Sequence, residues 1–160
     1  MITRHSNKQA FTVIELIFVI VVLGILSAIA LPKFIGSQKN AVIARGKSDV
    51  SAIRAAIMNE RQKRLVLGQV GFITKLDGGA AEDTAGETIF DNNGSASNGL
   101  LTYGITTSDS SGHWMKTGNN EYTYKISDDT SCTFKYTPTN GKFVLDDASD
   151  DIDECNKLVQ

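Results

Sequence analysis

The sequence predicts an α+β protein in which one long N-terminal helix, membrane-inserting in its first half, packs on a small antiparallel β-sheet. Three observations support this fold class: an uninterrupted apolar run near the N-terminus, a helical repeat of apolar residues after that run, and short alternating segments in the C-terminal third. The chain has 160 residues, of which 41% are hydrophobic. That composition allows one modest core, which predicts one soluble domain after the apolar run.

The apolar run follows a short cationic segment, residues 1–10, and contains no ionisable side chain from Leu16 to Leu31. This stretch is shorter than the roughly 20 residues that a membrane-spanning helix needs. Residues 11–14 therefore belong to the same helix, and Glu15 must lie near one membrane interface. We place the hydrophobic transmembrane helix at residues 11–32.

Glu15 is the one acid in this apolar region. A carboxylate at the centre of a membrane costs about 2.5–3.5 kcal/mol, so an acid kept there is by default a functional hypothesis. Thr12 and Glu15 also fit the capping-box pattern of a helix start, where the acid lies near the positive end of the helix dipole. The two roles are compatible, and both stay open at this point.

The residues that together resemble the N-terminus of type IV pilins and type II secretion pseudopilins are Ala10–Leu16, Gly24 and Ala30–Phe34. The resemblance implies that a prepilin peptidase cuts between Ala10 and Phe11 and methylates the new amine of Phe11. The family usually has glycine before the cut, where this chain has alanine. The resemblance also implies that Glu15, beside Thr12, serves assembly by pairing with the N-terminal amine of a neighbouring subunit. This pairing neutralises both charges where water is scarce.

The same resemblance implies partners and a location. Copies of the chain and related pilins would form a helical filament, built by an inner-membrane assembly platform and its ATPase machinery. The precursor would cross the bacterial inner membrane once, with its soluble domain in the periplasm, before it joins a periplasmic or cell-surface filament. More cations follow the span than precede it, so the positive-inside rule alone favours the opposite orientation.

A conventional secretory signal is the alternative from another class of protein. It would consist of the cationic start, an apolar core over Leu16–Leu26 and a cleavage site at Ala28-Ile29-Ala30. A soluble binding domain would then begin at Leu31. The two interpretations predict different mature N-termini, Phe11 and Leu31.

Apolar residues continue at helical spacing beyond the apolar run, at Val42, Val50, Ile53 and Ile57. The charged residues expected on the other faces of this helix are Arg45, Lys47, Asp49, Arg54 and Glu60. We therefore place the amphipathic half of the helix at residues 33–67. Gly24 and Pro32 weaken the helix through low propensity and a missing backbone donor. A kink in a permanently membrane-bound helix is the alternative interpretation.

Residues 68–99 are rich in small, polar turn formers and are predicted to form a connecting loop, with Ile89 and Phe90 as an apolar peg. The resemblance places the corresponding segment of pilins on the filament surface. An ordinary flexible loop is the alternative.

Residues 100–160 are predicted to form the antiparallel sheet. Leu100–Ile105 supplies one strand, and His113-Trp114-Met115 supplies either a strand or a packed loop. Two clear alternating runs follow, with apolar residues at Tyr122, Tyr124 and Ile126 and then at Cys132, Phe134 and Tyr136. Asn140-Gly141 predicts a hairpin turn before Lys142–Leu145. The amphipathic helix must cover the apolar face of this meander.

Cys132 and Cys155 are the two cysteines of the chain. In a protein exported to an oxidising compartment, such a pair is most simply a disulfide. The resemblance agrees, because many type IV pilins close a C-terminal loop with a disulfide, whereas major pseudopilins more often lack one. Two free thiols are the alternative.

The loop between these cysteines contains an acidic cluster that includes Asp147, Asp150, Asp151 and Asp153. Clustered carboxylates can bind calcium, and the resemblance adds that pseudopilins often bind it in their C-terminal region. The spacing matches no EF-hand loop, so a solvated acidic surface is the first interpretation and these residues are weak calcium candidates. No other cofactor is expected.

Charge and composition argue against two other classes of function. The net charge is −2, and loss of the leader with Arg4 and Lys8 leaves −4, without the basic stripe of a nucleic-acid-binding protein. His5 lies in the leader and His113 stands alone beside Trp114, so no catalytic set is visible. The chain is expected to be a substrate of processing enzymes, not an enzyme.

Overall fold

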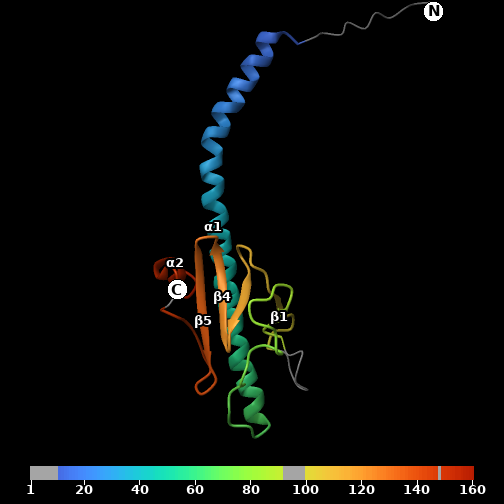
Figure 1. Cartoon of the computed structure of the whole chain (residues 1–160), viewed down its shortest axis with the longest axis vertical. Coiled ribbons are helices and arrows are strands. Elements are labelled where there is room, and N and C mark those ends of the chain that lie inside the picture. The colour runs from blue at the N-terminus through green and yellow to red at the C-terminus, as the bar shows by residue number, and fades with distance from the viewer. Residues whose placement is uncertain (1–10, 92–99, 148) are drawn as a thin grey trace, which may run out of the picture. The chain divides into compact units, whose positions relative to one another are not determined.

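The computed structural model describes residues 11–91, 100–147 and 149–160, except the side chains of 31–35 (Figure 1). The chain divides into two compact units, Met1–Gln38 and Lys39–Gln160. The boundary lies within helix α1, Val13–Val66, which is continuous through residues 24 and 32. The long helix predicted from the sequence is therefore confirmed, while its weakening at Gly24 and Pro32 stays a prediction.

Helix α1 ends at a glycine cap. Gly68 adopts a φ of 76°, which a residue without Cβ reaches at little cost. The amide of Gly68 donates to the Leu65 carbonyl, and the amide of Gln69 donates to the Arg64 carbonyl, at 3.0 and 2.8 Å. This paired pattern satisfies carbonyls that the last turn leaves without helical partners.

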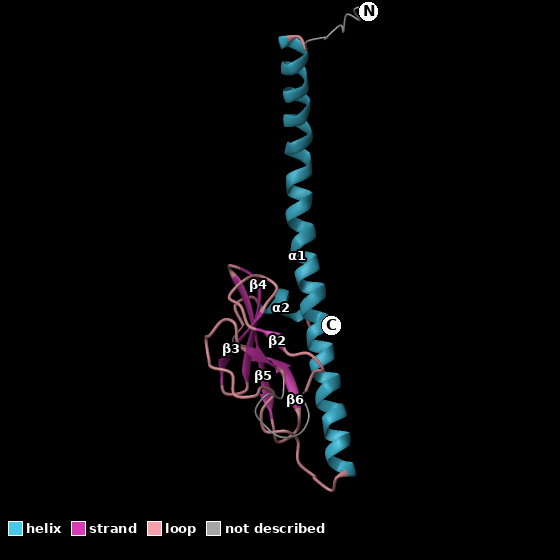
Figure 2. Ribbon diagram, turned by 90° about the vertical axis from the view of Figure 1, so that its right-hand side faces the viewer, coloured by secondary structure: helices cyan, strands magenta, loops and turns pink. Residues whose placement is uncertain are grey.

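Four strands form an antiparallel meander in the second unit (Figure 2): β3, Trp114–Gly118; β4, Glu121–Ser127; β5, Thr130–Thr137; and β6, Lys142–Leu145. The β5–β6 hairpin closes at Asn140-Gly141, where the amide of Lys142 donates to the Asn140 side chain at 3.0 Å. The predicted meander and its hairpin turn are confirmed.

The core lies between one face of this sheet and α1. The apolar helix positions Val50, Ile53 and Ile57 are buried, as their spacing predicts. Buried aromatic side chains from β3, β4, β5 and β6 face them, and Phe134 stacks on Phe143 with ring centroids 5.2 Å apart. The alternation of each strand thus places its apolar side chains toward the helix.

The segment after α1 has more structure than its composition indicates. A two-stranded ladder joins β1, Thr88–Ile89, to β2, Ile105–Thr106. Ile89 and Phe90 are fully buried, so the predicted apolar peg is present. The predicted strand Leu100–Ile105 is present only at its last residue, because the Leu101 amide bonds to the Phe90 carbonyl and turns the chain before β2.

Glu60 also differs from its predicted position. It was expected on an outer face of the helix but is only 6% exposed. Its carboxylate is paired with Arg64 at 3.2 Å and with Lys63 at 3.7 Å, both one turn further along α1. Paired cations on the same helix make the burial of this acid tolerable.

Candidate assembly site

The first unit consists of a helix whose apolar side chains are exposed on all sides. The large hydrophobic residues from Val13 to Ile29 are each 37–76% exposed. The window Val13–Ala30 has 18 residues, a mean hydropathy of 2.9 and no buried residue, so its length and composition suffice to cross a membrane. A continuous apolar surface of this extent marks a membrane or protein contact.

Thr12 and Glu15 form the start of this helix. The side-chain oxygen of Thr12 accepts a hydrogen bond from the Glu15 amide at 3.3 Å, and the Thr12 carbonyl accepts one from the Leu16 amide at 3.2 Å. Thr12 therefore acts as the N-cap, as one of the two interpretations of this pair expects. The Glu15 carboxylate is exposed in the first turn, and no cation lies within ion-pair distance among the residues that the structure describes.

The predicted cleavage site is described on one side only. Phe11 precedes the helix and is 85% exposed, whereas Ala10 lies outside the described residues. A new α-amine at Phe11 would lie one residue from the N-cap and about one turn from Glu15 of the same chain.

In the second unit, Cys132 of β5 and Cys155 of helix α2, Ile152–Asn156, form the predicted disulfide. Their Cα atoms are 5.5 Å apart and both residues are fully buried. Asp151 caps α2 by accepting a hydrogen bond from the Glu154 amide at 3.1 Å. The bridge therefore fixes the C-terminal segment to the sheet.

Glu154 ties α2 to α1. Its carboxylate contacts Lys157 at 2.7 Å and Lys39 at 3.3 Å. The hydrogen bond from Lys157, with help from Lys39, holds the pKa of Glu154 below its ordinary value. This acid stays charged at neutral pH, so the link between the two helices persists there.

Asp49 and Arg54, which were expected on outer faces of the helix, instead bond to the sheet. The Trp114 indole donates to the Asp49 carboxylate at 3.0 Å, and the Arg54 guanidinium donates to the Phe143 carbonyl at 3.0 Å. Both side chains lie at the border of the buried helix stripe, where their polar ends reach groups on β3 and β6. The sequence periodicity locates this border only to within one residue position.

A buried polar cluster joins the segment after α1 to the sheet, and the sequence did not reveal it. The Asp77 carboxylate accepts a hydrogen bond from the Tyr122 hydroxyl at 2.6 Å and pairs with Lys116 at 3.3 Å. Burial alone would raise the pKa of Asp77, but the bonds from Tyr122 and the Gly79 amide, with the Lys116 charge, lower it. One signal was present: Lys116 follows Trp114 by two residues and so takes the same inward-facing side of β3.

The acidic C-terminal cluster does not converge on one point. Asp150 accepts a hydrogen bond from the Ser131 amide at 3.0 Å, and Asp151 caps α2, while Asp147 and Asp153 are exposed. In the described part of the chain, no group of three or more His, Cys, Asp or Glu side chains could hold a metal ion. Asp150 and Asp151 thus have structural roles, and the described part of the chain does not bring the four carboxylates together as calcium ligands.

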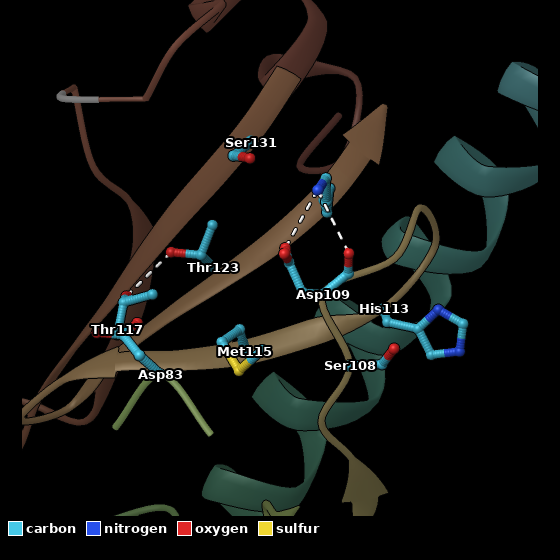
Figure 3. Close-up of a pocket in the computed structure, with 9 residues that line it drawn as sticks. Asp83, Ser108, Asp109, His113, Met115, Thr117, Thr123 and Ser131 are labelled. Atoms are coloured by element: carbon cyan, nitrogen blue, oxygen red, sulfur yellow. Dashed lines mark hydrogen bonds and ion pairs between the residues drawn. The ribbon is translucent and has the colours of Figure 1, made fainter. Parts of the chain in front are cut away.

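A shallow depression of about 320 Å³ lies on the face of the sheet that points away from α1 (Figure 3). Two of its hydroxyl groups are bonded to each other, with the Thr117 and Thr123 oxygens 3.0 Å apart, and Lys125 is held by Asp109 at 3.1 Å. The His113 ring nitrogen Nδ1 lies 3.0 Å from the Ser110 hydroxyl oxygen and 3.1 Å from the Ser111 carbonyl oxygen. Polar groups that already bond to other side chains thus line part of the depression.

The part of the chain that contains the helix start and the exposed apolar surface is similar in sequence to a known family. Residues 5–31 match the family model described as the prokaryotic N-terminal methylation motif. The chain thus carries the N-terminal methylation motif of type IV pilins and pseudopilins, and its α+β fold is pilin-like.

One relative makes the relationship more specific. The chain is distantly homologous to the type II secretion system core protein G of Pseudomonas aeruginosa, with 38% identity over 54 residues. The match covers 34% of this chain and 38% of that protein, so it leaves most of both sequences unaligned. No solved structure gives a significant match.

Proposed function

We propose that this chain is a structural subunit of a filament of the type IV pilus or type II secretion kind. A prepilin peptidase would cut it between Ala10 and Phe11 and methylate Phe11, and the subunits would polymerise through the apolar half of α1. The observation that supports this most strongly is the apolar helix that is exposed on all sides and has one acid, Glu15, in its first turn. The methylation motif at residues 5–31 supports it independently.

Assembly is driven by the need to remove this apolar surface from water. In the precursor, lipid covers the helix; in a filament, the helices of other copies take the place of lipid. Glu15 then lies in an environment with little water, where an unpaired carboxylate is costly. The methylated α-amine of Phe11 on a neighbouring copy supplies the opposite charge, and the pair lets both ions be buried together.

The partners and location follow from this proposal. They are the prepilin peptidase, an inner-membrane assembly platform with its ATPase, and other copies of the chain or related pilins. The precursor resides in the inner membrane, with the second unit in the periplasm, and the chain acts as a substrate and building block, not as an enzyme.

A pseudopilin that drives protein export is the more specific candidate. It is favoured by the relative named as a type II secretion core protein, whereas the Cys132–Cys155 disulfide is more usual in pilins. Deleting the gene distinguishes the two functions. Loss of secreted proteins from the medium indicates a pseudopilin, and loss of surface fibres indicates a pilin.

The proposal is tested by replacing Glu15 with Gln in the full chain in its native cells. The variant should be processed at normal efficiency but enter filaments at least tenfold less often, because the amine of its neighbour loses its counter-ion. Thr12→Val is the matched control, since it removes the capping hydroxyl and keeps the acid. If Glu15→Gln assembles normally and Thr12→Val does not, the acid serves only the helix start.

A further inference from the structure

The sheet of the second unit has two ends, and hydrogen bonds show which part of the chain lies beside each of them. The Tyr124 hydroxyl, on β4, bonds to the carbonyl of Val42, soon after the unit begins at Lys39. The Asn120 side chain, just before β4, bonds to the carbonyl of Thr74, beyond the end of α1. The β4–β5 turn therefore lies at the end near Val42, here named the proximal end. The β5–β6 turn lies at the opposite, distal end (Figure 1).

The distal end is cationic. Its exposed lysines are Lys63, Lys75 and Lys142. The Arg61 guanidinium lies over the Phe72 ring at 4.7 Å, and Gly141 packs against the same ring, so the end of α1 and the β5–β6 turn lie together. Two acids lie nearby, and both are already paired: Glu60 is buried and bonded to Lys63 and Arg64, and Glu121, next to Asn120, contacts Lys135 at 2.8 Å.

The distal end also exposes a group of large aliphatic side chains. Val66 and Val70 are 88% and 80% exposed, and Leu65 and Leu67 beside them are at least half exposed. Four large aliphatic side chains within six consecutive positions rarely remain in contact with water in a folded domain. This end therefore presents an apolar patch bordered by positive charge.

The proximal end is acidic. Asp128 and Asp129 form the exposed β4–β5 turn, and Asp109 lies beside them, since Lys125 contacts both Asp109 at 3.1 Å and Asp128 at 3.6 Å. The side chains of Asp109 and Asp128 are 82% and 95% exposed, so one lysine does not neutralise them.

Helix α2 adds to this charge. The contact between Lys39 and Glu154 places α2 at the proximal end, where Asp151 and Asp153 are exposed. Arg45 and Lys47 lie at the same level of α1, but they are two positions apart and so point to different sides of the helix. Lys125 pairs with Asp109 and Asp128, and Lys39 and Lys157 pair with Glu154. In the described part of the chain this leaves Asp129, Asp151 and Asp153 without an ion pair.

We propose that the distal end of one copy binds the proximal end of the next copy in the filament. The two ends are complementary in charge and lie on different parts of the same unit, so the contact is heterologous and repeats without closing on itself, as a filament requires. This inference rests on the proposed function and assigns to it a second interface, separate from the apolar helix. The aliphatic patch would be covered by the neighbouring unit, and the charges would set its orientation.

Chemical cross-linking of wild-type filaments gives a direct test. Carbodiimide joins a carboxylate to a lysine only when the two are in contact. Within one copy the two ends are separated by the length of β5, about 26 Å for its eight residues. Peptides that link Asp128 or Asp129 to Lys75 or Lys142 can therefore arise only between copies, and we expect mass spectrometry to find them.

Charge reversal tests the same contact in cells. Asp128→Lys with Asp129→Lys should reduce filaments at least tenfold, and so should Lys75→Glu with Lys142→Glu. Combining all four changes should restore filaments to within about threefold of wild type, because the charges are again opposite. Glu82→Lys is the control, since Glu82 is exposed and its neighbour Asp83 bonds to the main chain of Lys116, in the middle of β3 and between the two ends.

Absence of the predicted cross-links from filaments, together with normal assembly of both double variants, would overturn the inference. The proposed function would then still stand if those filaments depend on Glu15. If wild-type cells make no Glu15-dependent filament, both the proposed function and this inference are wrong. Because the cross-links are measured on the wild-type protein, a variant that folds poorly does not remove the test.

Discussion

The Tyr124 hydroxyl donates a hydrogen bond to the main-chain oxygen of Val42 at 2.7 Å, and so fastens β4, one of the two inner strands, to α1. The ring reaches the helix because Gly46, one turn later, has no side chain. A Cβ at this position would overlap the Tyr124 ring and lie 2.9 Å from a methyl carbon of Leu158. Burial raises the pKa of Tyr124 to about 12, so the hydroxyl remains a donor throughout the physiological range.

Gly46→Ala should destabilise the second unit by about 1–3 kcal/mol, the usual cost of overpacking, despite the better helix propensity of alanine. The melting temperature of the full chain in detergent measures the effect. Gly36→Ala is the control, because a Cβ added there would meet nothing within 4 Å and the change should be neutral or slightly stabilising. Equal melting temperatures for the two variants would show that the close approach at Gly46 is not needed.

Removing Lys116 should be more damaging than removing any exposed lysine. Lys116→Met leaves the buried Asp77 carboxylate without its cation, and breaking such a pair costs about 3 kcal/mol or more. Lys75→Met, on the exposed surface nearby, should change the free energy of unfolding by no more than about 0.5 kcal/mol. Adding Asp77→Asn to Lys116→Met should recover part of the loss, which urea unfolding curves can quantify.

The same pair predicts how stability depends on pH. The pKa of Asp77 is lower in the folded chain than its ordinary value of 3.8, so the unfolded chain binds this proton more readily. The stabilisation is therefore complete above the ordinary value and is lost as the pH falls through the folded value. Unfolding free energies measured between pH 6 and pH 2 should decline less for Asp77→Asn than for wild type. Parallel curves would contradict this assignment.

Replacing Cys132 and Cys155 with serine should lower the free energy of unfolding by roughly 3 kcal/mol, as expected for a loop of this length. The intact bridge is fully buried, so reductant should cleave it slowly unless denaturant is also present. Thiol labelling with and without urea measures this difference. Rapid reduction of the native protein would mean that α2 detaches readily from β5.

In an assembled filament, hydrogen exchange should be faster between Gly24 and Pro32 than in the flanking turns of α1. Glycine has low helix propensity and proline lacks a backbone donor, so we predict that this segment has the weakest helical hydrogen bonding. Gly24→Ala should slow the exchange. Equal protection along the whole helix would show that neither residue weakens it.

The long helix and the meander could be predicted because their patterns are local. Val50, Ile53 and Ile57 keep helical spacing, and the alternation around Tyr124 and Phe134 fixes which face of each strand is buried. The disulfide could be predicted because the chain has two cysteines and the resemblance implies export.

The polar contacts could not be predicted in the same way. Asp77 lies in a segment of small, turn-forming residues, and nothing near it in the sequence indicates Lys116 or Tyr122, 39 and 45 positions further on. Glu60 shows the same limit, because its burial depends on how the helix is rotated against the sheet. The complementary ends of the second unit likewise depend on the order of the strands and not on any single motif.

The central claim is that the apolar helix is kept in the mature protein and begins at Phe11. Intact-mass analysis of the chain from native membranes and from sheared filaments tests this most directly. We predict a protein without residues 1–10 that carries one added methyl group on the amine of Phe11. A soluble protein that begins at Leu31 would contradict the account, because it would have lost the surface through which the subunits are proposed to assemble.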